Sequence, residues 1–348
     1  MRIGIITFHW PENYGAVLQC YALQSYLEDQ GHTAEVINYQ PFHTGLYYLS
    51  ILIHPQLLGK FSEIRRRKQK KILLDRFRNK YLHLTKRYYT CAQLISANLD
   101  YDVIISGSDQ ILNPSFTLFG ERKPTATYYL PFGKSKKIGY AISFGCTVYP
   151  TDAAIYAKKW IRNYDVIGTR ESTGLNVLNQ LQYEGKKQVV PDPTILNYKE
   201  LFHNIAIPSS LDSYYCVYTI RHPFHLEADN EVKYIDDNHS PISLENWLGL
   251  IVHSKGLITN SYHGMIMAII AHVPFVALVE TASGKGMNDR FTTLLIHLGI
   301  DDRILPFDSE NSSVMELMEL PIRWDEVDKK MEMLSAVGTN FLKDYCHV

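Results

Sequence analysis

The sequence predicts an α/β protein made of two domains with parallel sheets, and three observations lead to this prediction. Short apolar runs alternate with stretches of helical periodicity in both halves of the chain. Polar turns follow the apolar runs, as they do at the carboxyl ends of parallel strands. The length of 348 residues is sufficient for two separate hydrophobic cores.

The first half of the chain is predicted to form a doubly wound sheet. A strand at 2–8, rather than a signal peptide, leads through a polar turn into a helix that ends at Gly31. An aspartate-containing turn, Pro191-Asp-Pro-Thr194, closes this half, and 197–212 is expected to be a connector. The other elements expected here are strands at 33–38, 101–106, 137–142, 166–169 and 188–190, and helices at about 152–162 and up to Leu181.

The second half repeats the alternation and ends in a long helix. Its expected strands are 214–220, 232–235, 257–259 and 275–279, and its expected helices are 243–253, 263–271, 289–298 and 325–345. The segment 282–286 is predicted to be a flexible, basic loop over the site. Two Rossmann-like halves joined by a linker form a glycosyltransferase-B-like arrangement with the active site between the domains. The predicted units are 1–200, 201–323 and a C-terminal helix at 324–348.

Composition excludes several classes of protein. Hydrophobic residues make up 46% of the chain and charged residues 20%, as in an ordinary globular protein. A formal net charge of −1 gives no overall attraction to nucleic acid. The five cysteines are scattered, and no zinc-binding pattern is present, so we predict no metal site and a reducing, cytoplasmic location. No apolar run is long enough to span a membrane.

One region departs from this charge balance. Between 60 and 87 there are twelve Lys and Arg residues and only two acidic residues, directly after an aromatic, apolar stretch at 46–53. An apolar face followed by a basic helix predicts that the insertion 45–90 rests on an anionic membrane surface. The alternative is a solvated basic helix beside a buried segment. The residues expected to contact the membrane are Arg65, Arg66, Arg67, Lys68, Lys70 and Lys71.

The turn Asn260-Ser-Tyr-His-Gly264 is the strongest candidate for chemistry. It follows an apolar strand and precedes a helix, so His263 falls where backbone N–H groups have no intrahelical partner and favour an anion. A histidine beside an anion site is a candidate acid or base for chemistry on a phosphate or carboxylate. The alternative is a histidine that only caps the helix.

Other strand ends supply further candidates. Arg170 directly follows an apolar strand. Its side chain either binds a ligand or forms an ion pair with Glu171 or a nearby aspartate. The turns at 13–15 and 107–110 can bind phosphate or sugar hydroxyls, although their glycines are also explained by the turns alone. Neither a dinucleotide fingerprint nor a Walker loop is present.

Taken in order, these motifs resemble those of the polysaccharide pyruvyl transferase family. The resemblance runs from residue 3 to about residue 300, and segment 45–90 matches least. The motifs are Ile5-Ile-Thr-Phe-His9, Asn13-Tyr-Gly-Ala16, Leu18-Gln19, Tyr21-Ala-Leu-Gln24, Ser106-Gly-Ser-Asp-Gln110, Ser143-Phe-Gly145, Arg170-Glu171, Asp192-Pro-Thr194 and Asn260-Ser-Tyr-His-Gly264.

The resemblance implies transfer of the enolpyruvyl group of phosphoenolpyruvate to two hydroxyls of one sugar, with release of phosphate. Phosphoenolpyruvate is then a co-substrate, and no further cofactor is expected. His263 is the expected acid, Arg170 the expected clamp on the donor, and Asp109 a candidate base unless it only bonds within its own turn. The expected donor contacts are Asn260, Ser261, Arg221, Arg290 and Lys285, and the expected acceptor contacts are Asn13, Tyr14, Gly15, Ser108 and Gln110.

One position departs from the family pattern. Cell-wall members of the family carry an arginine two residues before the histidine, where this chain has Ser261. The cationic contact that this arginine would make to the donor must therefore come from another residue, such as Arg221, Arg290 or Lys285.

The resemblance also implies an acceptor, which is expected to be a galactose 4,6-diol in a lipid-linked oligosaccharide at the cytoplasmic face of the membrane. Two other functions remain open at this point: a glycosyltransferase that uses a nucleotide sugar, and a non-catalytic scaffold for polysaccharide assembly. The sequence also leaves open whether the chain forms a homo-oligomer.

Overall fold

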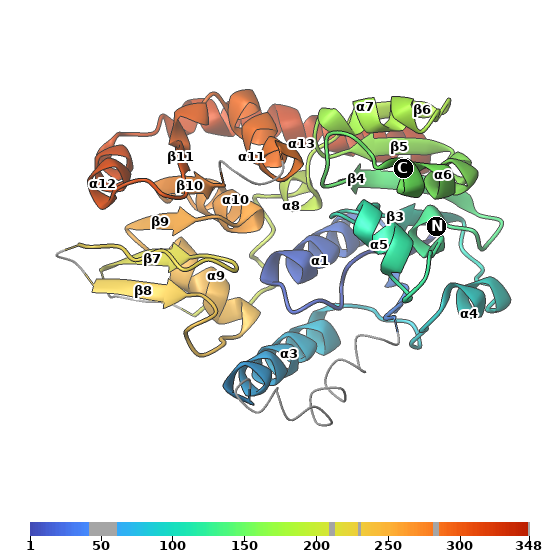
Figure 1. The fold of residues 1–348 in the computed structure, drawn as a ribbon, viewed down its shortest axis with the longest axis horizontal. Coiled ribbons are helices and arrows are strands. Elements are labelled where there is room, and N and C mark those ends of the chain that lie inside the picture. Colours follow the sequence, from blue (N-terminus) through green and yellow to red (C-terminus); the bar gives the residue numbers. More distant parts are fainter. Residues whose placement is uncertain (42–60, 209–212, 229–230, 281–284, 347–348) are drawn as a thin grey trace.

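The computed structural model describes residues 1–41, 61–208, 213–228, 231–280 and 285–346 and contains two parallel sheets side by side (Figure 1). The first sheet has the strand order β2-β1-β3-β4-β5-β6. Its strands are mostly buried apolar runs, as expected of a parallel sheet covered on both faces. They are β1 (Arg2–Ile6), β2 (Thr33–Val36), β3 (Val103–Ser106), β4 (Lys136–Ile142), β5 (Val166–Thr169) and β6 (Lys186–Val189).

The second sheet has the order β11-β10-β9-β7-β8, and its strands are also parallel. Apolar side chains of β7, β9 and β10 are fully buried in its core. The strands are β7 (Tyr214–Tyr218), β8 (Glu231–Ile235), β9 (Gly256–Thr259), β10 (Phe275–Val279) and β11 (Ile304–Pro306). The predicted two-domain, glycosyltransferase-B-like α/β fold is therefore confirmed.

Several helices begin where the sequence supplies a capping side chain. The side chains of Asn13 and Ser243 accept backbone N–H bonds at the starts of α1 and α9. The remaining helices are α4 (Cys91–Ser96), α5 (Pro114–Phe119), α6 (Thr151–Trp160), α7 (Thr173–Gln180), α8 (Pro193–Leu196), α10 (Tyr262–Ile270), α11 (Lys285–Leu298) and α12 (Asn311–Glu319), besides α1 (Tyr14–Asp29) and α9 (Leu244–Val252).

The structure differs from the predicted elements at several places, among them both sheet edges. Strand β6 begins at Lys186 and not at the predicted Gln188. Exposed and half-buried residues alternate along this edge strand, so it lacks a continuous apolar pattern. The short edge strand β11 and helix α12 were not predicted. Helix α11 begins at Lys285, so the predicted loop at 282–286 is wrong for its last two residues, while 281–284 lie outside the described part.

The last helix, α13 (Trp324–Cys346), returns the chain from the second domain to the first. It contacts α11 of the second domain and α8, which directly follows the first sheet. Phe341 packs against Tyr140 of β4, and the backbone at Gly338 approaches the hydroxyl of the same tyrosine. The predicted long C-terminal helix thus connects the two domains.

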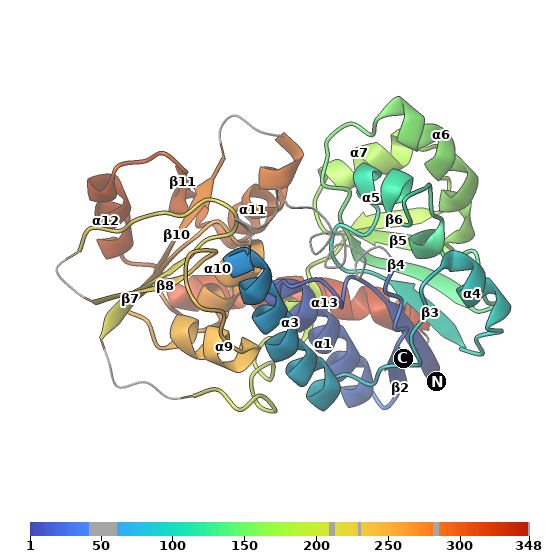
Figure 2. The same cartoon turned by 60° about the horizontal axis from the view of Figure 1, so that its bottom comes forward.

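Helix α3 (Phe61–Tyr81) carries most of the basic segment and lies across the gap between the domains (Figure 2). Four of its six predicted membrane cations have partners inside the chain. Arg66 pairs with Asp237, Arg67 with Glu12 and Lys71 with Asp75, while the ammonium of Lys70 lies over the ring of Tyr14. Arg65 and Lys68 are exposed. The apolar stretch at 46–53 lies outside the described residues.

The strand orders of the two sheets indicate where a ligand is expected to bind. In the first sheet the strand order reverses between β1 and β3, and in the second it reverses between β7 and β9. Ligands of open parallel sheets bind at the carboxyl ends of strands at such a switch point. The segments after these strands contain the turns at 13–15, 107–110 and 260–264, and the two switch points face each other across the domain interface.

Candidate functional site

The turn after β9 holds His263 rigidly at the start of α10. The side chain of Asn260 accepts a hydrogen bond from the Ile220 N–H and donates to the Ile220 carbonyl, tying this turn to the end of β7. Ser261 is the N-cap of α10 and accepts the N–H of Gly264. Both side chains therefore have structural partners, and their contact with a donor stays a prediction.

His263 lies between the domains and is almost completely buried. Its Nε2 lies 3.4 Å from Oδ2 of Asp192, and its side chain is only 8% exposed. The other ring nitrogen faces α1, because a Cβ added at Gly15 would overlap His263 Nδ1. Gly15 is therefore required where α1 and α10 approach each other. The predicted motif glycine and the predicted acid lie in direct contact.

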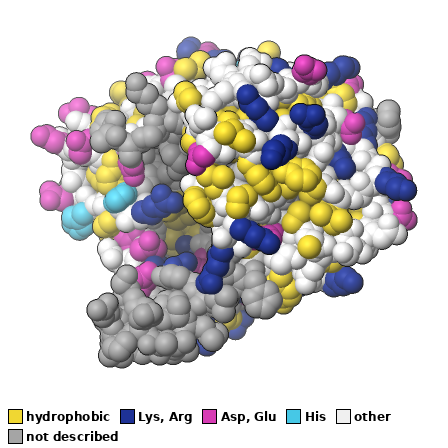
Figure 3. Space-filling view, turned by 45° about the vertical axis from the view of Figure 1, so that its right-hand side comes forward, with side chains coloured by type: hydrophobic (Ala, Val, Ile, Leu, Met, Phe, Trp, Pro, Cys, Tyr) yellow, Lys and Arg dark blue, Asp and Glu magenta, His cyan; other side chains and the backbone are white. Residues whose placement is uncertain are grey.

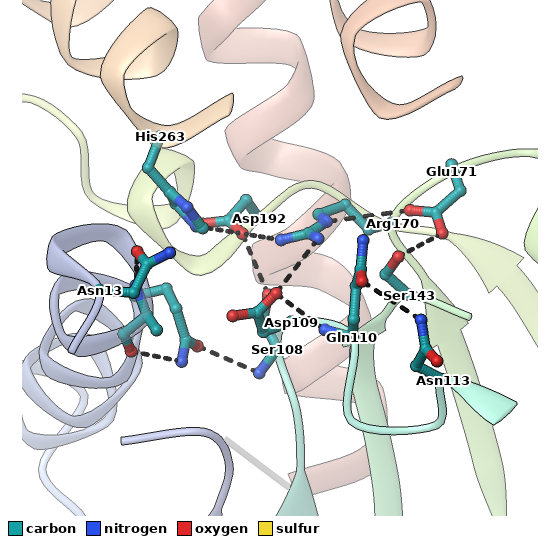
Figure 4. A network of polar contacts seen from close by, with 12 residues as sticks. Asn13, Ser108, Asp109, Gln110, Asn113, Ser143, Arg170, Glu171, Asp192 and His263 are labelled. Atoms are coloured by element: carbon teal, nitrogen blue, oxygen red, sulfur yellow. Dashed lines mark hydrogen bonds and ion pairs between the residues drawn. The ribbon is translucent and has the colours of Figure 1, made fainter. Parts of the chain in front are cut away.

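Asp192 is the centre of a network that connects both domains (Figure 4). Its Oδ1 accepts hydrogen bonds from the N–H and hydroxyl of Thr194, at 3.1 and 2.8 Å. Its Oδ2 accepts the hydroxyl of Ser108 at 3.0 Å and Nη1 of Arg170 at 3.0 Å. Burial raises the pKa of this carboxyl, but His263, Arg170 and the Thr194 N–H outweigh burial and hold the pKa below its usual value.

Arg170 has a fully buried side chain surrounded by carboxylates. Besides Asp192, it lies 3.6 Å from Asp109 and 3.8 Å from Glu171, and its guanidinium lies 4.9 Å from the centre of the Tyr262 ring. Burial alone lowers the pKa of Arg170, but the three carboxylates raise it above its ordinary value. The ion-pair alternative for Arg170 is thus observed. Its Nε and Nη2 still lack hydrogen-bond partners among the described residues.

The two other carboxylates differ in their surroundings. Glu171 is buried and accepts the Ser143 hydroxyl at 2.6 Å, and burial raises its pKa despite the nearby Arg170. Asp109 has a φ of 77° and accepts the N–H of Gln110 at 2.8 Å. The alternative in which Asp109 bonds within its own turn is therefore observed, and its role as a base stays a prediction.

A cavity of about 420 Å³ adjoins this network. It is lined from the first domain by Gln110 and Asn113, and from the second mainly by Arg221, His222, Asn260, Glu280, Asn288 and Arg290. Figure 3 shows the hollow between the domains with Lys or Arg and acidic side chains around it. Three predicted donor contacts (Asn260, Arg221 and Arg290) thus lie in its wall.

Arg290 connects the cavity with the buried network. Its guanidinium lies 5.6 Å from the centre of the Tyr262 ring, whose near neighbour is Arg170. Burial and the charge of Arg170 lower the pKa of Arg290. Its Nε has no hydrogen-bond partner in the described part of the chain, which suits a site for an anion. The side chain of Lys285 lies outside the described residues.

The residues predicted to contact the acceptor do not share one location. Asn13 caps α1, and Tyr14 is buried, stacks on Trp247 and donates its hydroxyl to the Ile242 carbonyl. Ser108 belongs to the buried network through Asp192. Among the predicted acceptor residues, Gln110 alone lines the 420 Å³ cavity.

The sequence analysis did not select Asp192 or Glu171 as site residues. Asp192 was visible as part of a motif, but its own Pro-Thr sequence also explains it as an N-cap of α8. The position of Asp192, directly after the last strand of the first sheet, is a signal that could have identified it as a site residue. Among the described residues no cluster of three or more His, Cys, Asp or Glu side chains is arranged to hold a metal ion. In the same part of the chain no helix is long and apolar enough to cross a bilayer.

Comparison with solved structures shows the fold. S. aureus MnaA, in a co-structure with UDP, is 9% identical, and the match covers 99% of this chain and 96% of that chain with a TM-score of 0.54. A Listeria monocytogenes protein described as a UDP-N-acetylglucosamine 2-epimerase is 10% identical, with coverage of 98% and 94% and a TM-score of 0.53. At such low identity the likeness shows the two-domain architecture alone.

Sequence comparison shows the family. No protein with a curated function matches the chain. The sequence profile of the family described as polysaccharide pyruvyl transferase matches residues 13–280, which include the turns at 13–15, 107–110 and 260–264 together with Arg170 and Asp192. The chain therefore belongs to the polysaccharide pyruvyl transferase family, a family of transferases.

Proposed function

We propose that this protein transfers the enolpyruvyl group of phosphoenolpyruvate to two hydroxyls of one sugar and leaves a cyclic pyruvate ketal. The observation that carries the proposal is the buried His263–Asp192–Arg170 network at the facing switch points of the two domains, in a chain of this family. A histidine beside a carboxylate supplies an acid, and nearby arginines suit a donor that carries a carboxylate and a phosphate.

We propose that the donor occupies the 420 Å³ cavity, with its anionic groups toward Arg221 and Arg290. Buried guanidinium N–H groups of Arg170 and Arg290 have no hydrogen-bond partner among the described residues, and Arg290 lines this cavity. Ser261, where related enzymes carry an arginine, is used as a helix cap, so Arg290 is the best placed replacement.

Each proton transfer of the proposed reaction has a candidate donor or acceptor. His263 donates a proton to the methylene carbon of phosphoenolpyruvate, which creates an oxocarbenium-like centre at the adjacent carbon. The first sugar hydroxyl attacks this carbon and loses its proton to a base, for which Asp109 is the candidate. The carbon–oxygen bond to phosphate then breaks, and phosphate leaves with the bonding electrons. The second hydroxyl adds to the same carbon, and its proton passes to the imidazole of His263, which restores the acid. One diol and one phosphoenolpyruvate thus give one ketal and one phosphate.

This function requires the domain interface to move. The His263 side chain is 8% exposed and does not line the cavity, so the donor must come between the domains to reach it. Opening and closing around a substrate excludes water from a reactive intermediate.

We propose a lipid-linked saccharide with a galactose 4,6-diol as the acceptor, because a 1,3-related pair of hydroxyls closes a six-membered ketal ring. A location at the inner face of the cytoplasmic membrane fits the exposed cations Arg65 and Lys68 of α3 and the exposed Ile72 on the same helix.

The test is incubation of the purified protein with phosphoenolpyruvate and lipid-linked galactosides. The expected result is release of inorganic phosphate together with a mass gain of one pyruvyl group on the acceptor. Release of a nucleotide from a nucleotide sugar, with transfer of its sugar, would instead identify a glycosyltransferase. Failure of both reactions with a range of acceptors would favour the non-catalytic scaffold.

A further inference from the structure

A second cavity lies between helix α3 and the segment that follows β8, and the site described above does not include it. Its volume is about 540 Å³. We call it the α3 cavity, and its lining residues are Ser62, Arg65, Arg66 and Gln69 of α3 together with Asn238, His239, Ser240 and Pro241.

The lining is polar and basic. Two guanidinium groups, two amides, two hydroxyls and an imidazole face the cavity, and none of the described acidic residues lines it. Arg66 is held 2.8 Å from Asp237, whereas Arg65 is exposed and has no ion pair with any described residue. This set of groups suits a ligand with both a phosphate and sugar hydroxyls.

The outer wall of the α3 cavity is held in place by ring stacking. His239 stacks on Tyr234 with ring centres 5.3 Å apart, and its Nδ1 lies 2.7 Å from Asp236. The backbone N–H groups of Asn238 and His239 also donate to the same aspartate oxygen. The cavity is therefore bounded by a preformed turn opposite a helix.

The α3 cavity leads inward to the catalytic candidates. Arg66, Ser240 and Pro241 also line a small inner cavity of about 30 Å³. Its lining further includes Tyr14 and Thr219, besides Lys70 and the carboxylates Asp236 and Asp237. The hydroxyl of Thr219 is buried and has no hydrogen-bond partner among the described residues. A buried hydroxyl without a partner is costly, so it indicates that a polar group enters here.

The inner cavity ends close to both His263 and the donor cavity. Tyr14 precedes Gly15, which contacts the His263 ring. Ile220 lines the inner cavity and the next residue, Arg221, lines the donor cavity. The inner cavity and the donor cavity thus lie next to each other at the segment that follows β7.

We infer that the α3 cavity binds the phosphate-bearing end of a phosphorylated saccharide acceptor. Arg65 and Arg66 hold the phosphate, and the sugar extends past Ser240 toward Thr219, Gly15 and His263. This inference rests on the proposed function, because it names the acceptor class of that same site. It also gives the exposed end of α3 a role besides contact with a membrane.

The experiment compares two water-soluble acceptors that differ only in the phosphate. One is a short-chain alkyl diphosphate of the sugar that the protein accepts, and the other is the alkyl glycoside of the same sugar. We expect a KM for the diphosphate at least about tenfold lower, since each charged hydrogen bond to phosphate contributes about tenfold or more in affinity. Arg65→Gln should remove this difference while the KM for phosphoenolpyruvate stays unchanged.

Arg76→Gln is the matched control. Arg76 is exposed on the same helix, loses the same charge and does not line the α3 cavity. The inference is overturned if Arg65→Gln keeps the preference for the diphosphate acceptor, or if Arg76→Gln loses it equally. An equal loss would indicate general attraction to the basic helix.

A second readout separates this inference from the proposed function. Binding of inorganic pyrophosphate, measured by calorimetry, does not depend on turnover. We expect Arg65→Gln to weaken it about tenfold relative to both the unmodified chain and Arg76→Gln. If no acceptor is pyruvylated but this difference is present, the proposed reaction fails and the anion site stands. If pyruvylation occurs and the difference is absent, the anion site fails alone.

Discussion

At the scale of single residues, Asp192 carries the negative charge that His263 and Arg170 share. Replacing it with asparagine preserves its shape but leaves the Arg170 cation with less compensation. We expect Asp192→Asn to lower kcat for phosphate release by about two orders of magnitude and the free energy of unfolding by about 3 kcal/mol. Urea unfolding and steady-state kinetics measure the two effects.

The pH dependence of the unfolding free energy tests whether Asp192 stabilises the fold through its charge or through packing. The pKa of Asp192 is held below its ordinary value in the folded chain, so its stabilisation is fully present above the unfolded pKa of about 3.9. The stabilisation is lost as the pH falls from there toward the folded pKa. The difference in unfolding free energy between the unmodified chain and Asp192→Asn should therefore be large at pH 7 and shrink below pH 4. A constant difference contradicts the assignment.

His263→Ala tests the acid directly. We expect no detectable ketal formation and a chain that remains folded, because the ring contributes no hydrogen bond to the backbone of its own turn. His263→Gln preserves more of the side-chain volume and should be equally inactive. Circular dichroism and thermal unfolding provide the control for folding. A near-normal rate in either variant excludes His263 as the acid.

Arg170→Ala leaves Asp192, Asp109 and Glu171 without their shared cation. We expect a loss of about 3–5 kcal/mol in unfolding free energy and at least about tenfold weaker use of phosphoenolpyruvate. Arg170→Lys retains a charge but not the guanidinium geometry, so it should recover part of the stability and little of the donor use. A folded Arg170→Ala protein with unchanged kcat and donor KM contradicts the clamp.

At the scale of elements, the contact between α1 and α10 depends on the absence of a side chain at Gly15. Gly15→Ala should lower both activity and stability, because the new Cβ overlaps the His263 ring. The same substitution in a His263→Ala background should cost less stability, since the ring is gone. Four unfolding measurements complete this double-mutant cycle. Additive effects contradict a direct contact between the two residues.

The elements themselves follow from patterns that are local in sequence. Buried apolar runs predict β1, β5, β9 and β10, and caps such as Ser243 and Gly31 predict helix ends, because both signals depend on neighbouring residues. The edge strand β11 escapes prediction, and the start of β6 is predicted two residues too late, since solvent replaces part of their apolar surroundings. The sequence of α3 strongly favours a helix, yet only the folded chain shows which of its cations form ion pairs with Asp237 and Glu12.

At the scale of the whole molecule, the two domains are connected by α13 and by contacts across the interface. Besides His263 and Asp192, Thr173 bonds to Asp289 at 2.5 Å, and Tyr14 bonds to Ile242. A donor that enters the interface must displace some of these contacts, and the covalent connections at the linker and α13 keep the domains aligned. This arrangement permits closure around a substrate while the two switch points stay opposite each other.

The surface of α3 leads to a prediction about membranes. Arg65 and Lys68 remain exposed, so the protein should bind vesicles that contain anionic lipid at low salt, and binding should fall steeply as salt rises. Lys68→Gln should weaken it, and vesicles of neutral lipid are the control. Cosedimentation provides the measurement. Salt-independent binding would indicate apolar insertion, and no binding at any salt would contradict a peripheral location.

The sequence alone was sufficient for the α/β class, the two-domain arrangement and the family motifs, and it offered His263, Arg170 and Asp109 as candidates whose roles stay predictions. These follow from strand periodicity, from caps and from polar residues at strand ends, all of which are written in short stretches of chain. Only the tertiary structure decided that Asp192 joins His263 and Arg170, that Asn260 and Ser261 hold their own turn, and that Gly15 makes room for the imidazole. Such contacts join residues far apart in sequence, and burial removes the solvent that would otherwise weaken the attraction between their charges.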